Sequence, residues 1–513
     1  MSADLVRVHP GVYHDSVSLM RVSQAVTGLP GVEVAVVAMA TELNLGIAAD
    51  LGFDLPEAGP GDLLIALRSG GPAEPEALRA ADAELGRLLA ELAVRVADDL
   101  SGAGGGHPPR TVRTAVRTAA RDAAHVTARG GADGGGATLA LVSVPGPYAF
   151  AEALDAIEAG LPVMIFSDNV PVEQEVFLKR RAGELGVLVM GPDCGTSVIG
   201  GAGLGFSNVL RPGPVGVVAA SGTGAQQVTC LLDLADVGVS HVLGVGGRDL
   251  SAEVGGLSTL RALEALDADP GTELIILISK PPAPEVGDTV RRAVGGLATP
   301  VVTALLGPGR DDLTAATETA LRALGVPVPV WRSWPAPAPA DDLPGGIRPG
   351  NTGHAEGTAD AADAGTRWDG GAGRAALWGV YSGGTLCAEA RLVAGTGEFT
   401  DFGDDAYTRG RAHPMIDPSL RLEALAKVPP GDVALLDVVL GHGADPDPSA
   451  RLAPGIATAV ARGVRVVVAL VGSGGDPQGL EVQAETLRAA GASVFASNAR
   501  AAGYAADIVA SLR

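Results

Sequence analysis

The sequence is poor in cysteine and lacks long apolar runs. Its three cysteines, Cys194, Cys230 and Cys387, are widely spaced and form no Cys-x-x-Cys pair. This pattern indicates neither a disulfide framework nor a thiolate zinc site, and no metal site is predicted. The longest apolar stretches, near residues 464–471, are much shorter than the roughly 18 residues that span a bilayer. A membrane protein is therefore not expected.

Positive charge is also scarce. Lys and Arg number 37 against 59 Asp and Glu, which gives a net charge of −22. Such a chain repels a phosphate backbone, so the expected partner is a small-molecule substrate and not nucleic acid. The first residues have neither the basic start nor the apolar core of a signal peptide. Together with the unpaired cysteines, this predicts a cytoplasmic protein.

The 513 residues are enough for three or four domains, since a domain has roughly 150 residues. Residues 15–27 have helical apolar spacing, residues 32–39 are rich in β-branched side chains, and residues 76–100 form a long Ala/Leu/Arg helix pattern. Gly-rich segments follow and close this part of the chain. We therefore predict an α/β N-terminal domain over residues 1–135.

From residue 137 onward, short apolar runs alternate with helical stretches, as in LALVSV, PVMIF, GVLVM, VGVVAA, HVLGV, ELIILIS and PVVTALL. Such alternation predicts doubly wound, parallel-sheet α/β domains that bind ligands at the carboxyl ends of their strands. Residues 331–375 are rich in Pro, Gly, Ala and Asp, which predicts a disordered linker. Four more runs, LWGVYSGG, DVALLDVVLG, RVVVALVG and SVFAS, predict another α/β domain over residues 376–513.

The sharpest motif is VGVVAASGTGAQQ at residues 215–227, an apolar strand followed by a Gly-rich turn and a helix. Its turn residues are Ser221, Gly222, Thr223 and Gly224. Free backbone N–H groups and the positive end of a helix dipole meet at such a turn and favour a bound anion. An ordinary strand-to-helix turn with Ser221 or Thr223 as N-cap explains the pattern equally well.

A second apolar strand ends in Gly441, His442 and Gly443 before another helix. This turn is a candidate for sharing one anion with the first. Strand ends in any α/β fold are loop-rich, so His442 is as readily a plain loop residue as a ligand contact.

Three further turns follow predicted strands and are candidates for substrate binding. Arg248 and Lys280 could meet a carboxylate or phosphate, although a surface ion pair explains either cation. No histidine near Cys194 would activate its thiol, which favours a packing role for that residue. The candidates are Asp193, Cys194 and Gly195, then Gly246, Gly247 and Arg248, and finally Lys280.

The densest polar cluster is DFGDDAYTRGRAHPMIDP at residues 401–418. A solvated loop explains its charges, while the two Xaa-Pro pairs near its end indicate fixed geometry. Arg411 could hold a carboxylate, and His413 could move a proton. The spacing matches no metal-binding motif.

Several stretches resemble the succinyl-CoA synthetase superfamily. Residues 144–195 resemble the second half of its CoA-binding domain and end in a turn like its Gly-Pro-Asn-Cys, here with Asp193. VGVVAASGTGAQQ with GVGGRDL resembles the ligase domain, and LDVVLGHGADPDPSA is more loosely similar to the carboxy-terminal domain of the beta subunit. HDSVSLMRVSQAV, KPP and HPMIDP point to FdrA-type proteins. The resemblance implies Rossmann-like and flavodoxin-like domains, CoA-binding-like over 136–212 and ligase-like over 213–330.

The sequence also departs from that superfamily. No histidine occurs between His241 and His354, where the ligases carry a phosphorylated histidine, and Gln227 stands where they have a supporting glutamate. Nor is there room for an ATP-grasp domain. The FdrA resemblance implies a subunit of an oxamate carbamoyltransferase that acts in allantoin breakdown together with partner subunits. Phosphate or carbamoyl phosphate would be its substrate, with CoA possible. An NDP-forming acyl-CoA ligase remains one alternative, and a noncatalytic subunit that binds an acyl phosphate or acts as a scaffold remains another.

The implied roles follow from this reading. Phosphate would be held by the backbone of Ser221–Gly224 and of Gly441 and Gly443. The oxamate carboxylate would be held by Arg248, Lys280 or Arg411. The proton would be transferred by His413 or His442.

Overall fold

The computed structural model describes residues 3–12, 14, 16–70, 74–100, 111–119, 137–337, 375–408 and 411–512. Its first unit is a three-stranded antiparallel sheet in the order β1-β3-β2. Apolar residues alternate along its strands, so both faces of the sheet are apolar and helices pack against each of them. The predicted helices and strand are present at nearly the predicted bounds. The elements are β1 (Ala3–His9), α1 (Ser16–Thr27), β2 (Val32–Met39), α2 (Glu42–Asp50), β3 (Leu63–Ser69) and α3 (Glu74–Leu100).

The second unit is a small parallel sheet in the order β4-β5-β6, packed against two helices. Helix α5 begins with Pro147 in its first turn, where a missing N–H costs nothing, and α6 ends at Gly186 in the left-handed conformation. The elements are β4 (Ala140–Val142), α5 (Gly146–Glu158), β5 (Val163–Ile165), α6 (Val172–Leu185) and β6 (Val189–Met190).

The third unit has a six-stranded sheet in the order β12-β11-β9-β10-β7-β8. Its central strands β9, β10, β11 and β12 are parallel and mainly apolar because helices cover both faces. The antiparallel hairpin β7–β8 extends this sheet, although its sequence lies in the range predicted for the preceding domain. The elements are β7 (Thr196–Ile199), β8 (Ala202–Gly205), β9 (Pro212–Ala219), α7 (Gly222–Leu234), β10 (Val239–Gly244), α8 (Leu257–Asp267), β11 (Leu274–Ser279), α9 (Pro284–Val294), β12 (Val301–Leu305) and α10 (Leu313–Ala323).

The last unit has a six-stranded sheet in the order β13-β18-β17-β16-β14-β15, parallel except at β13. The elements are β13 (Ser333–Trp334), β14 (Leu377–Tyr381), α11 (Gly384–Ala394), β15 (Glu398–Asp401), α12 (Asp405–Thr408), α13 (Ser419–Lys427), β16 (Val433–Val439), α14 (Pro448–Ala461), β17 (Arg465–Val471), α15 (Leu480–Ala489), β18 (Ser493–Phe495) and α16 (Asn498–Ser511).

The predicted linker needs one correction. Residues 331–337 are part of the folded structure, since β13 pairs with β18 and Trp331 is buried with its indole N–H donating to Glu318. The Pro-rich composition of this segment did not reveal that Trp331 and Trp334, the latter in β13, anchor it to the fold. The rest of the predicted linker, residues 338–374, lies outside the described residues.

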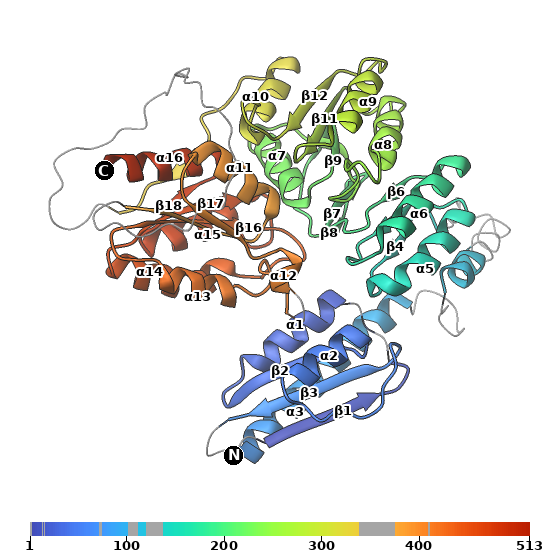
Figure 1. Ribbon diagram of the computed structural model, residues 1–513, viewed down its shortest axis with the longest axis vertical. Helices are drawn as coiled ribbons and strands as arrows, with labels where there is room; N and C mark the ends of the chain where they lie inside the picture. The colour runs from blue at the N-terminus through green and yellow to red at the C-terminus, as the bar shows by residue number, and fades with distance from the viewer. Residues whose placement is uncertain are drawn as a thin grey trace.

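The third and fourth units share one hydrophobic core. A single cluster of buried side chains runs from β9 and α7 through α10 to α11, α16 and β16. In Figure 1, α7 and α10 face α11 and α16, while the N-terminal unit lies below with α1 nearest to α12. The fold is therefore α/β with mixed sheets that are mainly parallel, as predicted, and its two large sheets are joined by helices packed between them.

Candidate functional site

Helix α7 begins at the carboxyl end of a central strand. After β9 the chain turns at Ser221, the N-cap, whose hydroxyl oxygen accepts a 2.9 Å hydrogen bond from the N–H of Gly224. Only glycine fits at residue 224, because a Cβ there would lie 2.6 Å from Ser221 Oγ. This cap leaves the N–H groups of Gly222 and Thr223 at the open end of the helix.

A second helix begins at the same place. Helix α11 starts after β14 with Gly383 as its N-cap, which offers no side-chain oxygen to the free N–H groups. The Ser221 hydroxyl donates a 2.6 Å hydrogen bond to Thr385 Oγ1 in the first turn of α11. A Cβ on Gly383 would lie 2.6 Å from the Thr223 side chain. The N-termini of α7 and α11 thus touch, and their positive dipole ends converge.

Two charged side chains stand at the start of α11. A Cβ built on Gly384 would lie 2.6 Å from Asp401 Oδ2 and 3.2 Å from Lys280 Nζ. Burial raises the pKa of Asp401 to about 6, while the Gly403 N–H and Lys280 act in the opposite direction and Asp437 adds to the increase. Within the described residues, no salt bridge occupies the Lys280 ammonium. It is a cation available to an anion at this site.

The turn before α11 is held by a buried ion pair. Asp437 on β16 accepts 2.7 Å and 3.0 Å hydrogen bonds from the N–H and hydroxyl of Ser382, and the Arg421 guanidinium lies 3.0 Å from it. Burial raises the pKa of Asp437 and lowers that of Arg421, and each charge partly offsets the other's shift. A lone aspartate in an apolar strand therefore fixes the position of the helix terminus.

His413 borders the same site. Its Nδ1 accepts a 3.2 Å hydrogen bond from the Met415 N–H, which leaves the proton of the neutral ring on Nε2. Nε2 and Asp401 Oδ1 both lie about 3 Å from the place of a Cβ on Gly403, at 3.0 and 3.1 Å. Burial, with help from Arg421, lowers the pKa of His413 to about 4. Near neutral pH this imidazole can donate a hydrogen bond but holds no charge.

The second predicted anion turn has a different place in the structure. Ser207 and His442 exchange two backbone hydrogen bonds of 3.2 and 2.8 Å, which form a bridge between the third and fourth units. Gly441 and Gly443 allow this approach, since a Cβ on either would meet Ser207 or Phe206 within 2.8 Å. The helix that follows has Asp447 as its N-cap, four residues beyond Gly443. These glycines make the close backbone contact between the two units, and their sharing of an anion with Ser221–Gly224 stays a prediction.

The predicted turns around Asp193 and Gly246 pack against each other. A Cβ on Gly246 would lie 2.4 Å from the Pro192 carbonyl oxygen, and one on Gly247 would lie 3.7 Å from Asp193 Oδ2. Cys194 is buried, and burial raises its thiol pKa to about 11, as expected for a packing cysteine. Gly195 accepts the Phe206 N–H.

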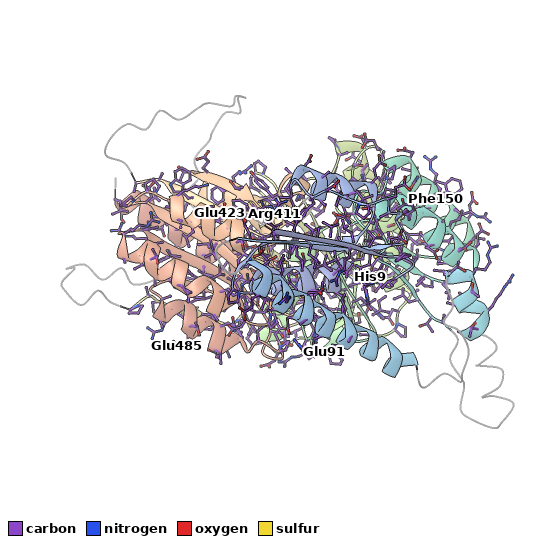
Figure 2. The ribbon with its side chains drawn as sticks, turned by 90° about the horizontal axis from the view of Figure 1, so that it is seen from below. His9, Glu91, Phe150, Arg411, Glu423 and Glu485 are labelled. Atoms are coloured by element: carbon purple, nitrogen blue, oxygen red, sulfur yellow. The ribbon has the colours of Figure 1, made fainter. Side chains whose placement is uncertain are left out.

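Arg248 is engaged with the second unit. Its guanidinium donates a 2.7 Å hydrogen bond to the Val170 carbonyl and lies 3.0 Å from Glu175. The neighbouring Asp249 pairs with buried Lys179. Arg411, whose side chain Figure 2 labels on the C-terminal unit, is exposed. Of the predicted site residues, the structure thus gathers Ser221–Gly224, Lys280 and His413.

Sequence reasoning missed Gly383 and Thr385, and it placed Asp401 in the polar cluster of residues 401–418 without giving that residue a role. The motif YSGGT carries the same signal as AASGTG, a Ser-Gly turn directly after a buried strand, and this signal could have identified both residues. Asp401 had no such signal, because only the parallel pairing of β15 with β14 brings it beside Gly384.

Comparison with known proteins places the chain in a family. Residues 380–508 match the family described as CoA-ligase, and residues 1–102 match the domain described as "AllF, heavy metal-associated domain". YahF of Escherichia coli K12, described as uncharacterized, is 35% identical over 97% of both chains. The chain belongs to the FdrA-type family of the succinyl-CoA synthetase superfamily. More distant relatives include an ADP-forming succinate–CoA ligase alpha subunit of Archaeoglobus fulgidus, 29% identical over 28% of this chain and 50% of the relative.

This FdrA-type chain thus spans about half the length of the succinate–CoA ligase alpha subunits it matches. Among solved structures, the dinucleotide-forming acetyl-coenzyme A synthetase 1 of Ca. Korarchaeum cryptofilum in complex with phosphate and ADP is 17% identical over 73% of this chain and 82% of that chain, with a TM-score of 0.26. A score so low carries no further argument. In the described part of the chain, no helix is long and apolar enough to cross a membrane.

The FdrA-type N-terminal domain does not fit the metal that its family description mentions. Residues 1–102 contain no cysteine, and the described residues hold no group of three His, Cys, Asp or Glu side chains arranged for a metal. Thiolates are the ligands that soft heavy metals prefer.

Gln227 also has a structural role in this FdrA-type chain. It is fully buried, its Nε2 donates a 3.0 Å hydrogen bond to the Ala496 carbonyl, and its Oε1 accepts a 2.8 Å hydrogen bond from the Asn498 N–H. Asn498 in turn donates to Glu389, whose pKa burial raises to about 8. Gln227 thus joins α7 to α16 and is not free to support a reactive histidine.

Proposed function

We propose that this chain binds phosphate or an acyl phosphate between the N-termini of α7 and α11 and transfers an acyl group to or from it. The observation that carries the proposal is the contact of Ser221 with Thr385, which brings two helix ends to one point. Free N–H groups of both helices and the nearby Lys280 ammonium suit an anion of two or more charges. Superfamily membership supports acyl chemistry as the class of reaction.

Within this class we propose carbamoyl transfer between oxalurate and phosphate. A phosphate oxygen attacks the carbamoyl carbon, a C–O bond forms, and the C–N bond to oxamate breaks. The proton of hydrogenphosphate passes to the leaving nitrogen, so that carbamoyl phosphate and oxamate result without a further reactant. Helix N–H groups would oppose the charge that develops on oxygen, and the His413 Nε2–H would donate a hydrogen bond.

Asp401 is better suited than His413 to carry the proton between the phosphate and the leaving nitrogen. The raised Asp401 pKa of about 6 lets this carboxyl accept and return a proton near neutral pH, whereas the His413 ring stays neutral at the same pH. Asp401 therefore takes the role that the sequence had given to His413 or His442. Lys280 would hold an oxygen of the phosphate or the oxamate carboxylate.

Two features support direct phosphate use over a phosphoryl-carrier mechanism. No histidine occurs between His241 and His354, and buried Gln227 replaces the glutamate that supports the carrier in related ligases. CoA ligation is the second candidate, and it is favoured by the CoA-ligase match over residues 380–508. Because the ligase relatives named above are subunits, we expect partner subunits to complete either activity.

The deciding experiment is thermal unfolding of the full chain with phosphate, with carbamoyl phosphate, and with CoA. A ligand at about 100 times its Kd stabilises the domain that binds it by roughly 2.7 kcal/mol. Stabilisation by the phosphate compounds, and its loss in Ser221→Ala, supports the transferase. Stabilisation by CoA alone supports the ligase. No shift with any of them contradicts both functions and favours a noncatalytic subunit.

A further inference from the structure

The N-terminal domain contacts the unit that carries His413. Gln24 on α1 donates a 2.9 Å hydrogen bond from Nε2 to the Ile416 carbonyl, 392 residues away in sequence. One turn earlier, Arg21 donates a 3.4 Å hydrogen bond to the Ala444 carbonyl. Figure 1 shows α1 as the helix of its domain that lies closest to the C-terminal unit. Two side chains on one face of α1 thus reach two backbone carbonyls of that unit.

The Ile416 carbonyl belongs to the turn that holds His413, and Ala444 precedes Asp445, whose N–H is bonded to that turn. The N–H groups of Ile416 and Asp417 both donate to the His413 carbonyl, at 2.7 and 2.9 Å, so residues 413–417 form one tight turn. The Met415 carbonyl accepts the Asp445 N–H at 2.9 Å. Movement of this turn therefore moves the imidazole at the site.

The turn is also anchored by its buried Met415 and Ile416 side chains and by Arg451. Arg451 donates a 3.1 Å hydrogen bond to the Ile416 carbonyl and lies within 3.2 Å of both Asp417 and Asp445. Gln24 takes the remaining acceptor position on the same Ile416 oxygen, since a carbonyl has two lone pairs. Arg451 is about one third exposed, so water weakens its ion pairs. The hydrogen bond from Gln24 adds a restraint that comes from a different domain.

We propose that helix α1 positions the turn 413–417, with Gln24 as the positioning residue that holds His413 at the α7–α11 site. This assigns a role to a domain that lacks the thiols of a heavy-metal carrier. The importance of His413 to catalysis rests on the proposed function, whereas the positioning itself rests only on the contacts described above. The domain acts on the reaction through the Ile416 carbonyl and does not touch the substrate.

The test compares Gln24→Met, which keeps the side-chain volume and removes the donor, with Thr27→Ala on the same helix. Thr27 is exposed and its hydroxyl bonds only within α1, to Ser23. Hydrogen–deuterium exchange of the full chain is followed at the amides of residues 415–417, and imidazole nitrogen NMR follows the His413 tautomer. We expect roughly three- to tenfold faster exchange in Gln24→Met, because this variant loses one hydrogen bond to the turn. We also expect the His413 signal to change.

Unchanged exchange and an unchanged His413 signal in Gln24→Met would overturn the proposal, as would equal changes in Thr27→Ala. If Gln24→Met unfolds the N-terminal domain, exchange also rises in the β1–β3 ladder, and Arg21→Ala then supplies the test with the same expected direction. Phosphate binding is measured on the same samples. Absence of phosphate binding in the parent contradicts the proposed function, while the exchange data still decide the positioning.

Discussion

Ser221 and Thr385 lie 164 residues apart in sequence, yet their hydroxyl oxygens are 2.6 Å apart. Ser221 is the N-cap of α7, and Thr385 lies in the first turn of α11. Each helix follows a buried parallel strand, and the two strands belong to different sheets. A shared core of α7, α10, α11 and α16 fixes this meeting point. The site therefore depends on how two domains pack.

Replacing Gly383 with alanine should push the two helix ends apart. The new Cβ would lie 2.6 Å from Thr223, inside the contact distance of any side chain. Overpacking of this kind costs about 1–3 kcal/mol of stability, and we expect phosphate affinity to fall by at least about tenfold. Isothermal titration calorimetry with phosphate measures the effect. Gly183→Ala in α6, where nothing lies within 4 Å, is the matched control and should keep parental affinity.

Replacing Lys280 with alanine should weaken anion binding without destabilising the fold. The ammonium is exposed, and among described residues no ion pair in the structure depends on it. We expect phosphate Kd to rise about tenfold, since a charge-assisted contact contributes roughly 1.5–3 kcal/mol. Lys427→Ala removes an exposed lysine at the end of α13 and serves as the control. Equal Kd values for the two variants would remove Lys280 from the site.

The Asp401 carboxyl should make anion binding depend on pH. Its pKa of about 6 means that it is mostly neutral at pH 5 and ionised at pH 7, beside the proposed anion. Sulfate keeps its charge over this range, so its affinity should fall by about tenfold as pH rises from 5 to 7. Asp401→Asn keeps the oxygen that accepts the Gly403 N–H and should bind sulfate with little pH dependence. A parental slope that persists in this variant contradicts the assignment.

His413 should make the chain less stable in acid. Its pKa of about 4 in the folded chain lies below the ordinary value of 6.5, so the unfolded chain binds the proton more readily. Stability from this residue is complete above pH 6.5 and declines as pH falls toward 4. In His413→Asn, whose oxygen can accept the Met415 N–H, this decline should be smaller by about 1–3 kcal/mol. Urea unfolding at pH 7.5, 5.5 and 4.5 measures the difference, and parallel curves for both proteins would refute the expectation.

The sequence by itself determined the local elements, because apolar periodicity and turn residues act over short distances. Neighbouring residues were enough to predict the strands that coincide with the short apolar runs, helix α3, the cap at Ser221 and the packing role of Cys194. The hairpin β7–β8 and strand β15 were not predicted, since their short, Gly-containing or polar segments are strands only through pairing with β10 and β14.

Tertiary structure alone decided which turns meet. Gly441–Gly443 and Gly383–Thr385 have the same local chemistry, a glycine turn after a buried strand, and only the structure shows that Thr385 is hydrogen-bonded to Ser221. Gly441 lies against the backbone of Ser207, next to the bridge between Ser207 and His442. The packing of α11 against α7 brings Thr385 to the site. The hydrogen bond from Gln24 to Ile416 had no local signal either, because it joins residues that only domain packing brings together.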